Sequence, residues 1–183
     1  ININNNPLFT NCIKPLVCSV QSPFRGLGHN MTHLTEGKKA PAFKGKDQNG
    51  DQVSLADFKG KKIVLYFYPQ DDTPTCTVQA CNLRDNFSLL KKQGFIILGV
   101  SPDEEKKHKK FEAKYDLPFT LIADADHKII DSYGVWGEKQ LYGKTYMGLH
   151  RTSFLIDEKG TYPIPRSHKS DVAQRILIHI TTL

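Results

Sequence analysis

The chain has 183 residues, of which 39% are hydrophobic and 24% are charged, and its formal net charge is +6. This composition is typical of a water-soluble globular domain with an ordinary core, and no apolar stretch is long enough to span a bilayer. The positive charges are spread along the chain and form no basic arm, which argues against a nucleic-acid-binding protein. We therefore expect neither a nucleic acid nor a membrane as partner.

The first 30 residues differ in composition from the rest of the chain. They contain no Asp or Glu and begin with the low-complexity run Ile1-Asn-Ile-Asn-Asn-Asn6. We interpret residues 1–30 as an N-terminal extension that is either disordered or a targeting leader, because transit peptides are poor in acidic residues. Cys12 and Cys18 fall in this extension and are assigned no catalytic role. One globular domain is expected over residues 31–183.

Strand and helix signals alternate from residue 41 onward. Apolar runs bounded by turn residues predict strands, and apolar residues three and four positions apart predict helices. In chain order these signals predict a hairpin of residues 41–43 and 52–55 around a turn at 48–51, a turn at 57–60, a strand at 62–68, a helix at 75–93, a strand at 95–100, a helix at 103–115, a strand at 119–122, a short helix at 128–133, a strand at 152–156 and a final helix around 172–180. Such alternation indicates an α/β fold with partly parallel strand pairing.

The segment with the clearest chemical content follows the strand at 62–68. It reads Pro69-Gln-Asp-Asp-Thr73-Pro-Thr-Cys76-Thr-Val-Gln-Ala-Cys81. A strand that ends at a proline, turns and starts a helix places Cys76 in the first helical turn. The helix dipole favours a negative charge there, and the thiolate is the reactive form of cysteine. The motif therefore predicts a nucleophilic Cys76, with Cys81 as a second thiol that resolves its oxidised form as a disulfide.

The spacing of these two cysteines adds a conformational prediction. Residues five positions apart in a regular α-helix have Cα atoms separated by roughly 8.6 Å. A disulfide rarely tolerates a Cα separation above about 7 Å. We therefore expect the first turns of this helix to unwind if Cys76 and Cys81 form a disulfide. The four cysteines are too few for a secreted disulfide scaffold, and such a transient disulfide favours a reducing compartment.

The motif and several later segments resemble the peroxiredoxins, and most closely their peroxiredoxin Q or bacterioferritin comigratory protein branch. The resemblance spans residues 38–160. It is carried by Phe67-Tyr-Pro69, Asp71-Asp-Thr-Pro74, Cys76, Cys81, Arg84-Asp85, Gly99-Val-Ser101, Tyr115, Leu117-Pro-Phe119, Gly134-Val-Trp136 and Arg151-Thr-Ser-Phe-Leu-Ile-Asp157. It implies a thioredoxin-like fold, with a central mixed sheet flanked by helices.

The resemblance also implies a function, the reduction of hydrogen peroxide and organic hydroperoxides in antioxidant defence and cell redox homeostasis. Cys76 would be the peroxidatic cysteine and Cys81 the resolving one, with Pro69, Thr73 and Arg151 as their active-site partners. The electrons would come from thioredoxin or a similar dithiol. No metal, haem, flavin or other cofactor is implied, because sulfur carries the redox change. A monomer or weak dimer is expected, in the cytoplasm, or in an organelle if residues 1–30 are a transit peptide.

The residues support these assignments on physical grounds. A hydroperoxide is cleaved when a thiolate attacks one oxygen, so the site must stabilise both the thiolate and the charge on the leaving oxygen. Arg151 offers a fixed cation with several donors. Thr73 lies three residues before Cys76 and can direct its hydroxyl at the sulfur or the peroxide. Backbone N–H groups at a helix start have no helical partner and are free to bind oxygen.

The sequence departs from the branch in two places. Thr75 occupies a position that is often glycine there, and a β-branched residue constrains the turn before the cysteine. The stretch Tyr162-Pro-Ile-Pro165 interrupts a strand expected after Gly160, because proline cannot donate to a ladder. The tail, residues 161–183, is therefore atypical.

Other interpretations remain open from the residues alone. Two cysteines on a helix can be small buried hydrophobes, whereas a zinc site would need a different spacing and a second ligand pair. A thiol–disulfide oxidoreductase would normally carry Cys-x-x-Cys, and a non-catalytic redox sensor or chaperone on the same fold is a further alternative. The histidines are scattered, and the run at 104–110 is interpreted as a solvated helix face.

Overall fold

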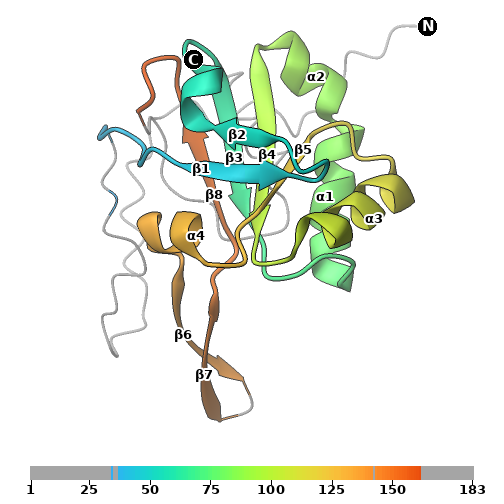
Figure 1. Cartoon of the computed structure of the whole chain (residues 1–183), viewed down its shortest axis with the longest axis vertical. Helices are drawn as coiled ribbons and strands as arrows, with labels where there is room; N and C mark the ends of the chain where they lie inside the picture. Colours follow the sequence, from blue (N-terminus) through green and yellow to red (C-terminus); the bar gives the residue numbers. More distant parts are fainter. Residues whose placement is uncertain (1–33, 35–36, 142, 162–183) are drawn as a thin grey trace, which may run out of the picture.

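The computed structural model of the chain describes residues 34, 37–141 and 143–161, and its centre is a six-stranded mixed sheet with helices on both faces (Figure 1). The sheet has the strand order β2-β1-β5-β4-β3-β8, and a separate two-stranded sheet pairs β6 with β7. The strands are β1 (Lys44–Asp47), β2 (Gln52–Ser54), β3 (Lys62–Phe67), β4 (Phe95–Ser101), β5 (Thr120–Ala123), β6 (Trp136–Leu141), β7 (Lys144–Leu149) and β8 (Thr152–Ile156). The helices are a 3₁₀ turn (Leu55–Phe58), α1 (Pro74–Asp85), α2 (Phe87–Lys92), α3 (Glu105–Tyr115) and α4 (Lys128–Ser132).

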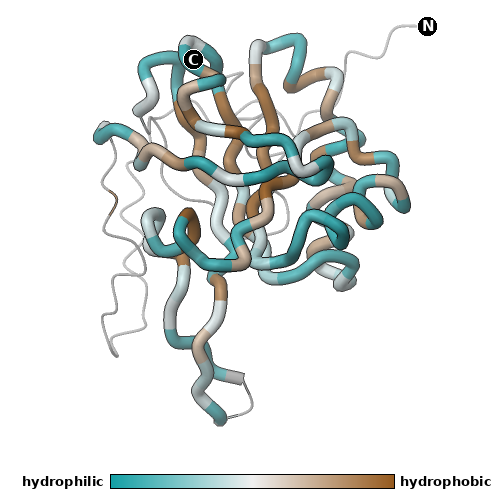
Figure 2. The backbone as a smooth tube through the Cα atoms, in the orientation of Figure 1, coloured by the Kyte–Doolittle hydropathy of each residue, from teal (hydrophilic) through white to brown (hydrophobic). Residues whose placement is uncertain are grey.

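The central strands are buried on both faces, because successive side chains of a strand point to opposite sides of the sheet. Val64, Tyr66 and Tyr68 pack with residues of α1, α2 and α3 on one face, and Ile63, Leu65 and their neighbours pack with α4 on the other. Figure 2 shows the hydrophobic segments gathered on these inner strands and the hydrophilic ones on α3 and the β6–β7 hairpin. The α/β class and the helix-flanked mixed sheet are therefore confirmed.

The parallel and antiparallel pairings fix where the strand ends meet. Strand β3 pairs in parallel with β4, and β4 pairs in parallel with β5, whereas β8 runs antiparallel to β3. Three strands consequently end at one edge of the sheet, and β8 begins at that same edge. The segments that follow β3 and β4 and the residue that precedes β8 are thus brought together.

One predicted helix is divided. The sequence pattern predicts a single helix over residues 75–93, but α1 ends at Asp85 and α2 begins at Phe87. Asn86 lies between them with φ −98° and ψ 6°, and its side-chain Nδ2 donates to the carbonyl of Asn82 at 2.9 Å. An asparagine that bonds a nearby backbone carbonyl competes with the helical pattern, which explains the break.

One strand prediction is wrong in position, and one hairpin was not predicted. The first strand is residues 44–47 and not 41–43. The β6–β7 hairpin, which projects below the main sheet in Figure 1, has no counterpart in the sequence prediction. Neither segment has the apolar alternation that marks a strand. At Gly45 in β1 a larger residue does not fit without a shift of its neighbours, because an added Cβ would lie 2.6 Å from Ile122 Cγ2.

His108 was expected on a solvated helix face, but its side chain is fully buried.

Some predictions lie outside the described residues. These are the extension at 1–30 with Cys12 and Cys18, the interruption at 162–165, and the final helix around 172–180, so the proposed domain limits stay predictions. Within the part of the chain that the structure describes, no helix is long and apolar enough to cross a membrane.

Candidate active site

The sheet topology brings Arg151 to the loop before Cys76. Phe67, the last residue of β3, pairs with Thr152, the first residue of β8. The segment 68–73, named here the active-site loop, leaves the sheet at this point and leads into α1. Arg151 immediately precedes β8, so it reaches the start of α1 although 75 positions separate it from Cys76 in the sequence.

Helix α1 begins as the motif predicts. Thr73 is its N-cap residue with an extended backbone, and Pro74 occupies the first helical position, where the missing N–H costs nothing. The first helical hydrogen bond runs from Thr77 N to Thr73 O at 2.8 Å. Cys76 therefore lies in the first turn, where the amides of Thr75 and Cys76 have no acceptor within the helix.

The sulfur of Cys76 is paired with a guanidinium group. Arg151 Nη2 donates to Cys76 Sγ at 3.0 Å, and Arg151 Nη1 donates to Gln79 Oε1. Cys76 is only 2% exposed, so the contact takes place in a largely dry environment where charge-assisted hydrogen bonds are strong. A cation and a helix N-terminus that both face one sulfur favour the thiolate, the form that attacks an electrophile.

Gln79 is a site residue that the sequence analysis missed. It is fully buried, accepts a hydrogen bond from Arg151, and its Nε2 has no partner among the described residues. Its position three residues after Cys76 on α1 is the signal that could have found it, because residues at that spacing share a helix face. Gln79 holds the guanidinium in place beside the sulfur.

Tyr66 on β3 is a second missed residue. Burial raises the pKa of its phenol well above the ordinary value, and the negative charges of Asp71 and Cys76 raise it further. The hydroxyl therefore stays protonated, and it is buried without a partner among residues 34, 37–141 and 143–161. The ring lies over Gly99, where an added Cβ would approach the Tyr66 hydroxyl to 2.8 Å.

The β6–β7 hairpin contributes a cation near the site. Lys139 Nζ donates to the carbonyl of Leu149 at 3.0 Å, two positions before Arg151. Burial lowers the pKa of Lys139, the charge of Arg151 lowers it further, and the charge of Cys76 acts in the opposite direction. The sequence contains no pattern that marks Lys139 as a residue near the site, because the hairpin that carries it was not predicted.

The remaining predicted residues are placed around Cys76 with less specific contacts. Thr73 is half-buried, and its Oγ1 donates to the carbonyl of Gln70 at 3.3 Å. Pro69 is half-buried in the active-site loop. Cys81 is half-buried and carries a free thiol on the same unbroken helix as Cys76, which is the arrangement that prevents a direct disulfide without unwinding. The roles of these three residues stay predictions.

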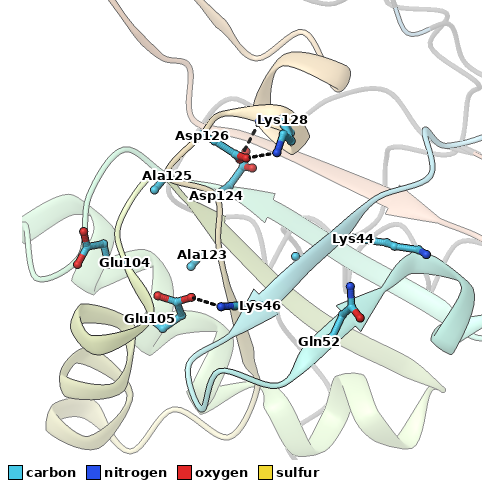
Figure 3. Close-up of a pocket in the computed structure, with 11 residues that line it drawn as sticks. Lys44, Lys46, Gln52, Glu104, Glu105, Ala123, Asp124, Ala125, Asp126 and Lys128 are labelled. Carbon is cyan, nitrogen blue, oxygen red and sulfur yellow. Dashed lines mark hydrogen bonds and ion pairs between the residues drawn. The ribbon is translucent and has the colours of Figure 1, made fainter.

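A hollow of about 570 Å³ lies apart from these residues, at the edge formed by β1, β2 and the start of α3 (Figure 3). Its charged groups largely pair with one another. Lys46 Nζ lies 3.8 Å from Glu105 Oε1, and Lys128 Nζ lies 2.5 Å from Asp126 Oδ2. None of the residues described around Cys76 lines it, so we assign it no part in the chemistry.

Comparisons with known proteins show the family of the chain. Residues 36–162 match the model of the AhpC/TSA family. Peroxiredoxin Bcp of Escherichia coli is 52% identical over 130 residues, which cover 71% of this chain and 83% of that protein. Peroxiredoxin Bcp of Bacillus subtilis is 48% identical over 124 residues, which cover 68% of this chain and 79% of that protein.

Solved structures lead to the same group. A structure of peroxiredoxin Q from Xanthomonas campestris superposes with a TM-score of 0.73 at 30% identity, covering 83% of this chain and 98% of that one. BcpB of Mycobacterium tuberculosis superposes with a TM-score of 0.70 at 27% identity, covering 80% and 96%. The chain therefore belongs to the AhpC/TSA family and is a thiol peroxidase of its peroxiredoxin Q or bacterioferritin comigratory protein branch.

Proposed function

We propose that Cys76 is the peroxidatic residue and that this chain reduces hydrogen peroxide and organic hydroperoxides. The observation that carries the proposal is the 3.0 Å contact between Arg151 Nη2 and Cys76 Sγ at the start of a helix. The thiolate attacks one peroxide oxygen, the O–O bond breaks, and the other oxygen leaves as hydroxide or alkoxide and takes up a proton. Cys76 becomes a sulfenic acid.

The surrounding groups stabilise the charge that moves during this step. Arg151 offers donors both to the sulfur and to a peroxide oxygen bound beside it. The amides at the start of α1 add further donors, and Thr73 adds a hydroxyl if it turns from the Gln70 carbonyl toward the substrate. Gln79 keeps the guanidinium fixed, so little reorganisation is needed when the peroxide arrives.

The bacterioferritin comigratory protein of Xanthomonas campestris, which has a similar structure, has alkyl peroxide reduction activity. We propose the same substrate class for this chain. Because Cys76 is 2% exposed, the approach to the sulfur is narrow and suits a small terminal –OOH group.

Turnover requires the sulfenic acid to be removed. In our proposal the thiol of Cys81 attacks Cys76 Sγ, water leaves, and an intramolecular disulfide forms after the first turns of α1 unwind. Thioredoxin or a similar dithiol then reduces that disulfide. Both cysteines lie on one helix, so a monomer is sufficient for the cycle. The need for a dithiol reductant favours a reducing compartment such as the cytoplasm.

The proposed electron donor can be tested by steady-state turnover. We expect continuous NADPH consumption when the reduced protein is mixed with thioredoxin, thioredoxin reductase and hydrogen peroxide. A disulfide substrate offered in place of the peroxide should not support turnover, which separates this activity from that of an oxidoreductase. Oxidation of Cys76 once per chain, without recycling by any dithiol, would instead indicate a redox sensor.

A further inference from the structure

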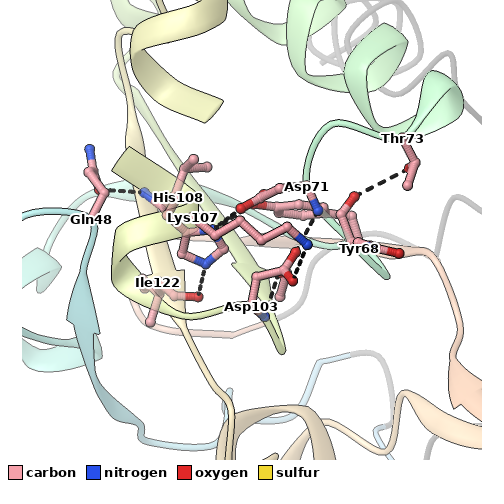
Figure 4. A network of polar contacts seen from close by, with 11 residues as sticks. Gln48, Tyr68, Asp71, Thr73, Asp103, Lys107, His108 and Ile122 are labelled. Atoms are coloured by element: carbon pink, nitrogen blue, oxygen red, sulfur yellow. Dashed lines mark hydrogen bonds and ion pairs between the residues drawn. The ribbon is translucent and has the colours of Figure 1, made fainter. Parts of the chain in front are cut away.

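A buried polar network connects the active-site loop with α3 (Figure 4). Asp71 of the loop is 3% exposed and His108 of α3 is 0% exposed. His108 Nδ1 lies 2.6 Å from Asp71 Oδ2, and the hydroxyl of Tyr68 donates to Asp71 Oδ1 at 2.7 Å. On the other side of the ring, His108 Nε2 lies 3.2 Å from the carbonyl oxygen of Ile122. The loop is thereby tied to α3 and to β5.

Both nitrogens of the histidine ring have a polar partner. Nδ1 faces the Asp71 carboxylate, and Nε2 faces the carbonyl oxygen of Ile122. Burial raises the pKa of the Tyr68 phenol, so this hydroxyl stays a donor. Every polar atom of the Asp71 carboxylate and the His108 ring is therefore paired.

The loop has two further attachments to the same part of the fold. The backbone N–H of Asp71 donates to Asp103 Oδ2 at 2.5 Å, and Lys107 holds that carboxylate through Oδ1 at 2.6 Å. At the surface, Asp72 pairs with Lys114 at 2.7 Å and accepts a hydrogen bond from the hydroxyl of Tyr115 at 2.6 Å. Surface ion pairs contribute little to stability, so we take the buried network as the stronger anchor.

We propose that Asp71, His108 and Tyr68 are positioning residues that hold the active-site loop against α3, and we name these three residues the latch. The latch sets how readily the first turns of α1 unwind. Cys76 is only five positions beyond Asp71. A displacement of Cys76 toward Cys81 must therefore rotate the chain just after the anchor, and the buried network resists that rotation. The inference rests on the proposed Cys76–Cys81 disulfide cycle and adds a determinant of its rate.

The latch would decide between two fates of the Cys76 sulfenic acid. While the loop is latched, a second hydroperoxide can oxidise the sulfenate to sulfinic acid, as its O–O bond breaks and an alcohol or water leaves. When the latch opens, the Cys81 thiol attacks the same sulfur, the S–O bond breaks and water leaves with formation of the disulfide. A weaker latch should favour the disulfide and slow the first reaction with peroxide.

Asp71→Asn and Asp72→Asn form a matched pair for the test. Each removes one carboxylate charge of the same loop that bonds side chains of α3, but only Asp71 is buried. Asp72 has φ +59°, a conformation that asparagine tolerates well. In the reduced full chain, we expect Asp71→Asn to speed amide hydrogen exchange at residues 77–79, the first amides bonded within α1, by about tenfold, the order expected for loss of a charge-assisted hydrogen bond in the interior. Asp72→Asn should change it little.

The second readout is the product formed with excess peroxide, measured by mass spectrometry of the Cys76 peptide. We expect Asp71→Asn to give less sulfinic acid and faster disulfide formation, while its second-order rate constant with peroxide falls. Faster disulfide formation together with a slower reaction with peroxide would not follow from a general loss of stability of the fold. Equal exchange at residues 77–79 in both variants, with an unchanged product ratio, would overturn the latch.

A milder variant keeps the test valid if Asp71→Asn unfolds the whole domain. Loss of protection in β3 and β4 would reveal that unfolding. Tyr68→Phe then removes one hydroxyl and leaves the ring in place, and a smaller acceleration of exchange confined to residues 77–79 is expected. Exchange in the reduced protein needs no peroxide chemistry, so failure of the latch is distinguishable from failure of the cycle, which would show as no disulfide in the unaltered chain.

Discussion

Cys76→Ser should abolish peroxide consumption. A serine hydroxyl lacks the nucleophilicity of a thiolate, and removal of a covalent nucleophile typically lowers rates by factors above about 10³. Hydrogen peroxide consumption by the reduced variant, followed with thioredoxin and its reductase, is the measurement. The matched control is the double substitution of Cys12 and Cys18 by serine, which removes two thiols from residues 1–30 and should leave the rate unchanged.

Cys81→Ser separates the two sulfur roles. Each chain should consume one equivalent of peroxide, after which Cys76 remains as a sulfenic acid that a dimedone-type reagent traps, because no second thiol lies on α1 to displace the hydroxyl. Excess peroxide should then drive Cys76 to the sulfinic acid. Undiminished turnover of this variant with thioredoxin would show that Cys81 is not the resolving residue and that α1 need not unwind.

Arg151→Gln should lower the second-order rate constant with hydrogen peroxide by about 10²- to 10³-fold, the range observed when one donor that stabilises developing charge is removed. The variant loses both the cation beside Cys76 Sγ and the hydrogen bond to Gln79. Arg151→Lys keeps the positive charge but loses the planar guanidinium group, so its rate constant should lie between those of the unaltered chain and Arg151→Gln. Rapid mixing in a single turnover isolates this step from recycling.

Arg84→Gln is the control for loss of an arginine. Arg84 lies on the same helix as Cys76, but it contacts Asp85 and the carbonyl of Tyr115. Its substitution should leave the peroxide step within about twofold, because an exposed ion pair contributes little. A loss in Arg84→Gln as large as that in Arg151→Gln would attribute the effect to the stability of α1 and not to charge at the sulfur.

The sequence predicted the parts of the fold that rest on local patterns. The buried strands around residues 62–68, 95–100 and 152–156 have continuous apolar runs, and Pro74 marks the start of the helix that carries Cys76. By contrast, the β6–β7 hairpin is polar and glycine-rich, so its pairing is visible only in three dimensions.

The candidate site was predictable to the extent that it lies in one motif. Arg151 was assigned through the family resemblance alone, because its approach to Cys76 depends on the antiparallel pairing of β8 with β3. His108 stands in a charged run of α3 that looks solvated. Its burial follows from tertiary packing of α3 against the active-site loop, and no local pattern reports such a contact.

The central claim is that Cys76 is an anion held by Arg151 and the start of α1. Site-resolved alkylation by iodoacetamide at one fixed neutral pH, quantified by mass spectrometry, tests it most directly, since only the thiolate reacts. We predict that Arg151→Gln slows alkylation at Cys76 and leaves alkylation at Cys81 unchanged, because only Cys76 has the guanidinium beside its sulfur. Equal alkylation rates at Cys76 in the unaltered chain and in Arg151→Gln would contradict the claim.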